Sequence, residues 1–332
     1  MSGVQTVKVA DDEADLRLDR WFKRRFPLLG HGRLEKLLRT GQVRIDGKRA
    51  KANDRLEPGQ EIRLPPGVDK PPPEGKGPPG REERPRVTAA DADYVRSLVI
   101  HRDEDVIALN KPPGLAVQGG TGTHRHLDGM LDALRFDAPD RPRLVHRLDR
   151  DTSGVLLLAR TRRAAARLAA SFRGKTARKL YWALVAGAPK PERGQVDIPL
   201  AKEAGPLGER VARNDEDGQR AVTLYATVET ASHHAAWLVM WPLTGRTHQL
   251  RVHTAQGLGM PIVGDSKYGG KEALMTGSVS RKLHLHARSI LLPHPSGEGI
   301  LKVSAKLPDH MRETWELFDF DADAEVDPFP RD

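Results

Sequence analysis

Cysteine is absent from the 332-residue sequence, and long apolar runs are absent as well. The lack of cysteine excludes disulfide bonds, thiolate nucleophiles, iron–sulfur clusters and thiolate-bound zinc. No apolar stretch approaches the roughly 20 residues that a membrane-spanning helix needs. The opening MSGVQTVKVADDE also lacks the basic flank and apolar core of a signal peptide. We therefore expect a cytoplasmic protein.

Loops that bind nucleotide phosphates are missing too, because the sequence contains neither GxGxxG nor GxxxxGK[ST]. Histidines occur in pairs such as His284 with His286, but without the helical spacing and intervening acid of a zinc-binding helix. Ser153 has no GxSxG elbow around it, which argues against a serine hydrolase. The sequence thus predicts no cofactor and no metal. A metal-dependent hydrolase that uses His and Asp stays open as an alternative.

Positive charge, by contrast, is abundant. The chain has 54 Lys and Arg against 45 Asp and Glu, a net charge of +9. Residues 16–55 contain 13 basic and 4 acidic residues, so this segment alone carries an excess equal to that of the whole chain. Such a concentration of charge favours a polyanionic partner, because Lys and Arg that neutralise phosphates release bound counterions.

Two short basic helices and a hairpin are predicted in this segment. Leu18, Phe22 and Phe26 recur at helical spacing in RLDRWFKRRFP and predict the first helix. The stretch RLEKLLRTG predicts the second helix, and QVRIDGKRA predicts two strands around an Asp-Gly turn. A solvated charged face is the simpler alternative. In this pattern, residues 16–64 resemble the S4 RNA-binding domain, which implies binding to structured RNA. The basic residues expected to contact RNA here are Arg17, Arg20, Arg33, Lys36, Arg39 and Arg44.

The rest of the chain predicts an α+β fold. Residues 65–86 hold 8 Pro and 4 Gly, the composition of an extended linker. Strand-like runs then recur (VIALNKP, VLLLAR, KLYWALVAG, AVTLYATVET, AAWLVMWPL and LHLHARSILL) with one clear helix, TRRAAARLAASF. Because helices and strands do not alternate regularly, we expect a mixed, mainly antiparallel sheet flanked by helices over residues 92–318. The acidic end, residues 319–332, is predicted to be a disordered tail.

The stretch HRLDRDTSGVLLLAR places an aspartate before a polar turn and a buried strand. Small polar residues and Gly suit the turn, and the apolar run suits a packed sheet, so Asp149 is expected at the edge of a strand. Taken alone, Asp149 could simply pair with Arg147 or Arg150. A second stretch, PLTGRTHQLRVH, gathers planar hydrogen-bonding side chains, among them Arg246 and His248, in a density that suits RNA.

HRLDRDTSG, KLYWALV and GRTHQLRVH, in this order, resemble the RluA-type pseudouridine synthases, and the first motif is most similar to the RluC type. The resemblance implies isomerisation of specific uridines in 23S ribosomal RNA of the large subunit, with the target base flipped out of its stack. Catalytic roles would fall on Asp149 as nucleophile or base, on Tyr181, and on Arg251 as the partner of Asp149. Arg147 would hold the RNA after flipping, and Arg150, Arg246 and His248 would also contact RNA.

Without the resemblance, Tyr181 would be a core aromatic residue beside Trp182 in an alternating strand. Its implied role fits a hydroxyl that can transfer a proton beside a ring that can face uracil. The implied isomerisation needs no cofactor. No membrane is expected, nothing in the sequence demands more than a monomer, and the expected partner is ribosomal RNA, either free or in an assembling particle. A non-catalytic RNA-binding factor in ribosome assembly is the alternative. Whether Asp149 attacks the uracil ring or the sugar carbon stays open.

Overall fold

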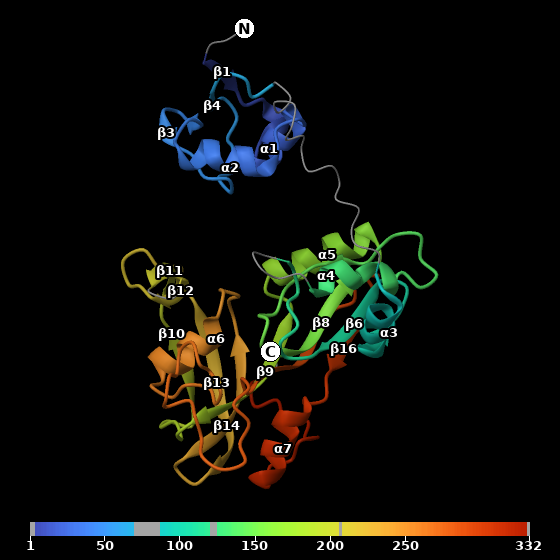
Figure 1. The fold of residues 1–332 in the computed structure, drawn as a ribbon, viewed down its shortest axis with the longest axis vertical. Helices are drawn as coiled ribbons and strands as arrows, with labels where there is room; N and C mark the ends of the chain where they lie inside the picture. Colours follow the sequence, from blue (N-terminus) through green and yellow to red (C-terminus); the bar gives the residue numbers. More distant parts are fainter. Residues whose placement is uncertain (1–3, 70–86, 120–124, 206–207, 331–332) are drawn as a thin grey trace. The chain divides into compact units, whose positions relative to one another are not determined.

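The computed structural model describes residues 4–69, 87–119, 125–205 and 208–330. The chain folds as two compact units, residues 1–86 and residues 87–332 (Figure 1). Each unit buries apolar clusters of its own. Most of the predicted linker, from residue 70 to residue 86, lies outside the described residues.

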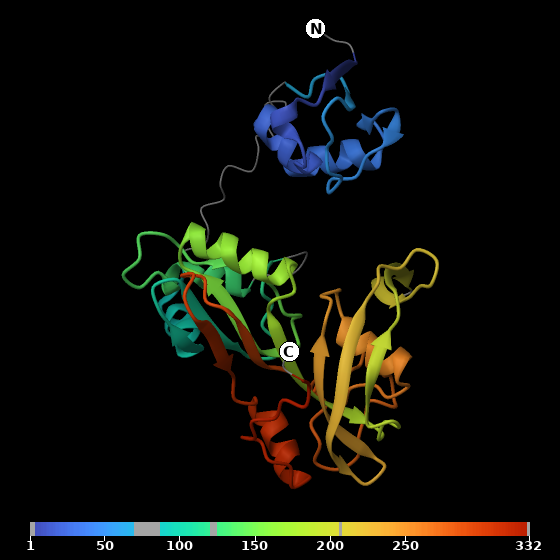
Figure 2. The same ribbon diagram turned by 180° about the vertical axis from the view of Figure 1, so that it is seen from behind.

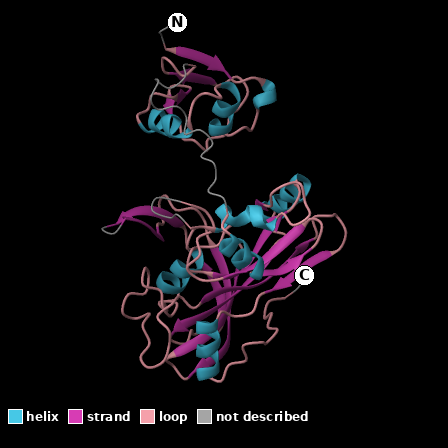
Figure 3. Cartoon of the chain, turned by 45° about the vertical axis from the view of Figure 1, so that its right-hand side comes forward, coloured by secondary structure: helices cyan, strands magenta, loops and turns pink. Residues whose placement is uncertain are grey.

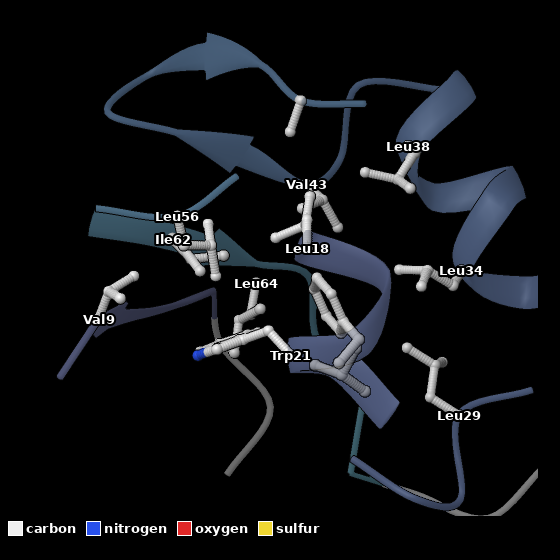
Figure 4. Close-up of a cluster of buried hydrophobic side chains, with 13 residues drawn as sticks. Val9, Leu18, Trp21, Leu29, Leu34, Leu38, Val43, Leu56, Ile62 and Leu64 are labelled. Carbon is white, nitrogen blue, oxygen red and sulfur yellow. The ribbon is translucent and has the colours of Figure 1, made fainter. Parts of the chain in front are cut away.

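The first unit packs two helices on a small sheet. Leu18, Trp21 and Phe22 from one helix and Leu34 and Leu38 from the next are buried against the strands (Figure 4). Both predicted helices are confirmed, over Leu18–Arg25 and His31–Arg39. The predicted Asp-Gly turn is confirmed as well, since Asp46 and Gly47 adopt positive φ, 46° and 77°, as this hairpin turn requires. The elements are β1 (Gln5–Lys8), η1 (Asp11–Glu13), α1 (Leu18–Arg25), α2 (His31–Arg39), β2 (Arg44–Ile45), β3 (Lys48–Arg49) and β4 (Glu61–Leu64).

The second unit is built on a mixed sheet whose main path runs β10-β13-β14-β9-β15-β8-β6-β5. Only the pair β8 and β15 is parallel among the paired strands that the structure describes, so the predicted mixed, mainly antiparallel sheet is confirmed. Along this path the strands are β10 (Arg193–Asp197), β13 (Val222–Ala231), β14 (Ala235–Pro242), β9 (Arg178–Ala186), β15 (Leu285–Pro293), β8 (Ser153–Ala159), β6 (Val106–Lys111) and β5 (Val99–Arg102). Off the path, β7 (Arg143–Leu144) pairs with β8, and β16 (Ile300–Ser304) pairs with β15.

Helices surround this sheet, and the strands run through the middle of the unit (Figure 3). Helices α3, α4 and α5 lie around the half that contains β6 and β8, whereas α6 lies beside β13 and β14 (Figures 1 and 2). These elements are α3 (Ala89–Ser97), α4 (Leu127–Met130), η2 (Leu131–Leu134), α5 (Arg162–Arg173), α6 (Gln249–Val252), a π-helical turn η3 (His253–Gly257) and α7 (Asp309–Leu317). A separate hairpin joins β11 (Leu200–Gly205) to β12 (Gly208–Arg213).

Strand β8 is the apolar run that follows HRLDRD, and all seven of its residues are buried, as predicted. Its first residues meet β15 in the parallel pair, where Gly154 lies opposite Ala287. Gly154 has φ of 110°, and a Cβ there would lie 2.2 Å from the Ala287 carbonyl oxygen. Glycine is therefore required for β8 to approach β15 this closely.

The acidic end of the chain corrects one prediction, because residues 319–330 pack against the second unit instead of forming a disordered tail. The Phe320 ring is 6% exposed and lies 5.9 Å from the ring of Trp237 and 6.0 Å from that of Trp315. Further on, the Asp327 carboxylate accepts a hydrogen bond from Arg178 at the start of β9. Composition suggested disorder, but the aromatic residues of the segment bury enough apolar surface to hold it in place.

Candidate active site

A cleft of about 710 Å³ opens in the second unit where the loop before β8, the first half of β9 and the segment from β14 to α6 meet. The three residues that the resemblance marks as catalytic, Asp149, Tyr181 and Arg251, all line this cleft. They come from segments up to about one hundred positions apart in the sequence. Of the predicted RNA contacts, Arg147, Arg246 and His248 line it as well.

The loop that carries Asp149 is fixed to β8 by His146. Burial, and to a lesser degree the charge of Lys179, lower the pKa of His146 to about 3, so the ring is neutral. Its Nε2 accepts a hydrogen bond of 2.8 Å from the backbone N–H of Leu157. The loop then brings Asp149 to the cleft with its side chain 22% exposed, open enough to meet a substrate yet largely withdrawn from water.

Lys111, at the end of β6, fixes the other side of the same loop. Its side chain is fully buried, and burial lowers its pKa to about 7 against the opposing charges of Asp151 and Asp149. The ammonium donates to three backbone carbonyl oxygens, at 2.9 to 3.0 Å, of Pro112, Leu115 and Arg150. Because Arg150 directly follows Asp149, these bonds restrain the aspartate backbone beside the cleft.

Tyr181 faces the cleft from β9, where it pairs with Met240 of β14 and Ala287 of β15. Burial raises the pKa of its hydroxyl, and the negative charge of Asp149 adds to the rise. The hydroxyl therefore keeps its proton at neutral pH and can donate it. Its neighbour Trp182 is fully buried in the cluster with Trp237 and Trp315. This packing fixes the part of β9 that carries Tyr181.

Arg251 reaches the cleft but is ion-paired differently from the prediction. Its Nε and Nη2 donate to the two carboxylate oxygens of Asp265 at 2.8 and 2.6 Å, with both side chains at most 8% exposed. Burial lowers the pKa of Arg251, but the bond to Asp265 and the charges of Asp265 and Asp149 outweigh this and raise it. Asp149 therefore interacts with Arg251 through its charge, without a hydrogen bond. The hydrogen-bonded partner of Arg251 is Asp265, which the sequence did not reveal.

Gln249 holds the turn of GRTHQLRVH against the sheet. Its side-chain oxygen accepts from the Arg246 N–H at 3.0 Å and from the Thr244 hydroxyl at 2.7 Å, and its amide donates to the Val222 carbonyl at 2.9 Å. The side chain is 3% exposed, so these bonds form away from water, where they are strong. This buried amide presents Arg246 and His248 at the rim of the cleft.

Positive side chains surround the cleft more fully than the sequence predicted. Arg173 at the end of α5, Lys175 after it, and Lys179 in β9 line the cleft together with Arg147. Burial lowers the pKa of Lys179. The signal available in the sequence was the basic cluster RGKTARK between the predicted helix and the predicted strand. Together these cations suit the phosphates of a nucleic acid.

The remaining predicted RNA contacts lie elsewhere. Arg150 does not line the cleft, and its exposed guanidinium donates to the Gly114 carbonyl at 3.1 Å. Six residues belong to the first unit, where Arg20, Lys36, Arg39 and Arg44 are exposed, Arg17 pairs with Asp19, and Arg33 donates to the Gly67 carbonyl. The structure therefore divides the predicted contacts between the two units.

Two features are absent from the residues that the structure describes. No group of three or more His, Cys, Asp or Glu side chains there is arranged to hold a metal ion. In the same residues, no helix is both long and apolar enough to cross a membrane.

Comparisons with known proteins show the family of the chain. Residues 105–256 match the family described as RNA pseudouridylate synthase. RNA pseudouridine synthase 4, mitochondrial, of Arabidopsis thaliana is 37% identical over 96% of this chain and 82% of its own length. Ribosomal large subunit pseudouridine synthase C of Vibrio cholerae is 35% identical over 93% of this chain and 95% of its own length.

Among solved structures, human RNA pseudouridylate synthase domain containing 4 superposes with a TM-score of 0.57 at 29% identity and covers 69% of this chain and 95% of its own. The matched family region, residues 105–256, includes Asp149, Tyr181 and Arg251. Sequence and fold thus lead to one family. The chain belongs to the RNA pseudouridine synthases of the RluA/RluC type.

Proposed function

We propose that this protein isomerises specific uridines of large-subunit ribosomal RNA to pseudouridine, with Asp149 as the catalytic carboxylate. One observation carries the assignment of residues: Asp149, Tyr181 and Arg251, distant in sequence, line a single cleft whose walls are otherwise rich in cations. The substrate class rests on relatives named ribosomal large subunit pseudouridine synthase C.

The reaction moves one bond and consumes nothing. The glycosidic bond from sugar C1′ to uracil N1 breaks, the uracil turns, and C1′ joins uracil C5; the C5 proton leaves while N1 gains a proton. The uracil must first leave its base stack and enter the cleft, because its reacting atoms are inaccessible in stacked RNA. A volume of about 710 Å³ accommodates a flipped nucleotide, whose site would be largely preformed.

Each residue then has a distinct task. Asp149 supplies the carboxylate that attacks or takes the proton, and the nearby guanidinium of Arg251 offsets the cost of holding that charge away from water. Tyr181, with its hydroxyl protonated, offers a ring face to the uracil and a proton to a developing anion. The exposed Arg147, two residues before Asp149, is placed to hold the RNA strand that the flipped base has left.

The first unit is proposed to be an S4-like RNA-binding domain over residues 16–64. Its support is the helix pair and hairpin, together with the excess of positive charge in residues 16–55. We propose a monomer acting in the cytoplasm on ribosomal RNA or on an assembling particle.

The decisive test is incubation of the purified protein with unmodified large-subunit ribosomal RNA, followed by carbodiimide modification and primer extension to map pseudouridine. We expect new stops with the wild type, and a rate at least about a thousandfold lower with Asp149→Asn, which keeps the shape of the side chain and removes its charge. Asp151→Asn, an exposed carboxylate two residues away, is the matched control and should retain activity.

The same experiment separates the enzyme from a non-catalytic assembly factor. Equal stops with the wild type and with Asp149→Asn would remove Asp149 from the mechanism. Binding of both proteins to RNA without stops, on free RNA and on isolated precursor particles alike, would favour the assembly factor.

A further inference from the structure

His248 has a backbone conformation that its residue type rarely adopts. Its φ of 54° and ψ of 17° are left-handed, at the position that precedes α6. This conformation is unfavourable for a residue with a Cβ atom, because the Cβ comes close to the following carbonyl oxygen. Such strain persists where the surroundings hold it in place, and it is concentrated at functional sites. The conformation directs the His248 ring into the cleft.

One nitrogen of that ring is held by Tyr268. The distance from His248 Nδ1 to the Tyr268 hydroxyl oxygen is 2.6 Å, and the two rings meet edge to face. The same hydroxyl oxygen accepts a hydrogen bond of 3.3 Å from the backbone N–H of Val211 in β12. Tyr268 is 9% exposed and its own N–H donates to Asp265 at 3.0 Å, so it is fixed at both ends.

These bonds allow the Tyr268 hydroxyl to donate a hydrogen bond to His248 Nδ1. Burial raises the pKa of Tyr268, so its hydroxyl keeps the single proton it has. That oxygen accepts from Val211, and its own proton can be donated to His248 Nδ1. When Nδ1 accepts this bond, the proton of a neutral His248 ring is on Nε2.

The His248 ring is neutral near pH 7. Burial lowers its pKa, the charge of Asp149 opposes the change, and the charges of Arg251 and Lys267 add to it. The Nε2–H faces Asp149, with Nε2 3.9 Å from the carboxylate oxygen Oδ2. This is longer than a hydrogen bond, but catalytic contacts in an empty site often shorten when the substrate binds.

We propose that His248 is a positioning residue that holds the Asp149 carboxylate through Nε2–H, and that Tyr268 fixes the ring for this task. The inference rests on the proposed function. It assigns to His248 a role beyond the RNA contact predicted from sequence, and it gives Tyr268 a role that no motif suggested. The chain of contacts runs from Val211 of β12 through Tyr268 and His248 to Asp149.

Two substitutions of His248 separate positioning from RNA binding. Asn tolerates the left-handed backbone, but its short amide cannot reach Asp149. Gln is long enough to place an N–H near the position of Nε2. The measurement is single-turnover release of tritium from RNA labelled at uracil C5, across RNA concentrations, with urea unfolding of each variant as the control for folding.

We expect His248→Asn to slow the chemical step about tenfold to a hundredfold, because a misplaced reacting group costs about this much. The RNA concentration for half-maximal rate should stay the same. His248→Gln should recover most of the rate, and Tyr268→Phe should lose less than His248→Asn.

A wild-type rate with His248→Asn, an equal loss with Asn and Gln, or a change confined to the half-saturating RNA concentration would overturn the proposal. The last result would return His248 to RNA binding. An inactive wild type would be a different failure, since it would remove the proposed function and this inference with it.

Discussion

At the scale of single residues, the ion pair of Arg251 and Asp265 connects stability to the site. Both carboxylate oxygens of Asp265 are bonded to Arg251, and one also accepts from the N–H groups of Lys267 and Tyr268. The side chain of Asp265 is fully buried. One aspartate thus fixes both the guanidinium beside Asp149 and the tyrosine that holds His248.

We predict that Asp265→Asn lowers the free energy of unfolding by about 3–5 kcal/mol, because it leaves the charge of Arg251 buried without its counterion. Urea unfolding measures the change. The matched control is Asp197→Asn, which breaks the exposed pair with Arg220 and should have no measurable effect. Similar losses from the two variants would show that burial of the pair does not matter.

Some residues of the candidate site could be predicted from the sequence and others could not, for physical reasons. Asp149, Tyr181 and Arg251 stand in ordered motifs, and the structure brings all three to one cleft. Asp265 and Tyr268 stand in a segment with no motif, and only the fold of the chain between α6 and β15 brings them to Arg251 and His248. A carboxylate that neutralises an arginine leaves no local pattern, so the ion pair of Arg251 with Asp265 could not be predicted from the sequence.

At the scale of elements, the strands with continuous apolar runs were predicted, and the short ones were missed. β6, β8, β9, β13, β14 and β15 correspond to the predicted runs, because buried strands must be apolar on both faces. β7 and β16, at the margin of the sheet, are too short or too polar to show a pattern. The prediction for the final segment failed for another reason, since its acidic composition concealed Phe320 and Phe329.

We predict that Phe320→Ala lowers the free energy of unfolding by about 3–5 kcal/mol, because it empties space beside Trp237 and Trp315. Leu317→Ala is the matched control, three residues earlier with its side chain 54% exposed, and should change stability by less than about 0.5 kcal/mol. Unfolding in urea, followed by tryptophan fluorescence, distinguishes the two. A stable Phe320→Ala protein would mean that the final segment adds nothing to the core.

The final segment also supports the cleft. Arg178, which is bonded to Asp327, lies with its guanidinium 4.2 Å from the ring centre of Trp241, a residue that lines the cleft. Phe329 contacts the same tryptophan at 5.8 Å between ring centres. The end of the chain therefore packs behind a wall of the proposed active site.

At the scale of the whole molecule, the excess of positive charge and the proposed catalytic residues lie in different units. Composition predicted a polyanionic partner and located the charge excess in residues 16–55, but it could not show that the basic side chains there stay exposed. The structure does so for Arg20, Lys36 and Arg39, for which no ion pair is found among the described residues. The residues proposed to be catalytic, by contrast, all lie in the second unit.

This division predicts how RNA binding responds to salt. Each cation that neutralises a phosphate adds about 0.7–0.9 to the slope of log affinity against log salt. Replacing Arg20, Lys36 and Arg39 together with Gln should therefore flatten the slope by about 2 and weaken binding, while the single-turnover rate at saturating RNA stays unchanged. Filter binding from low to high salt gives the slope.

Arg24→Gln, in an exposed pair with Asp12, is the control. An unchanged slope in the triple variant would show that these side chains do not contact RNA, and a lower saturated rate would show that the first unit takes part in the chemical step.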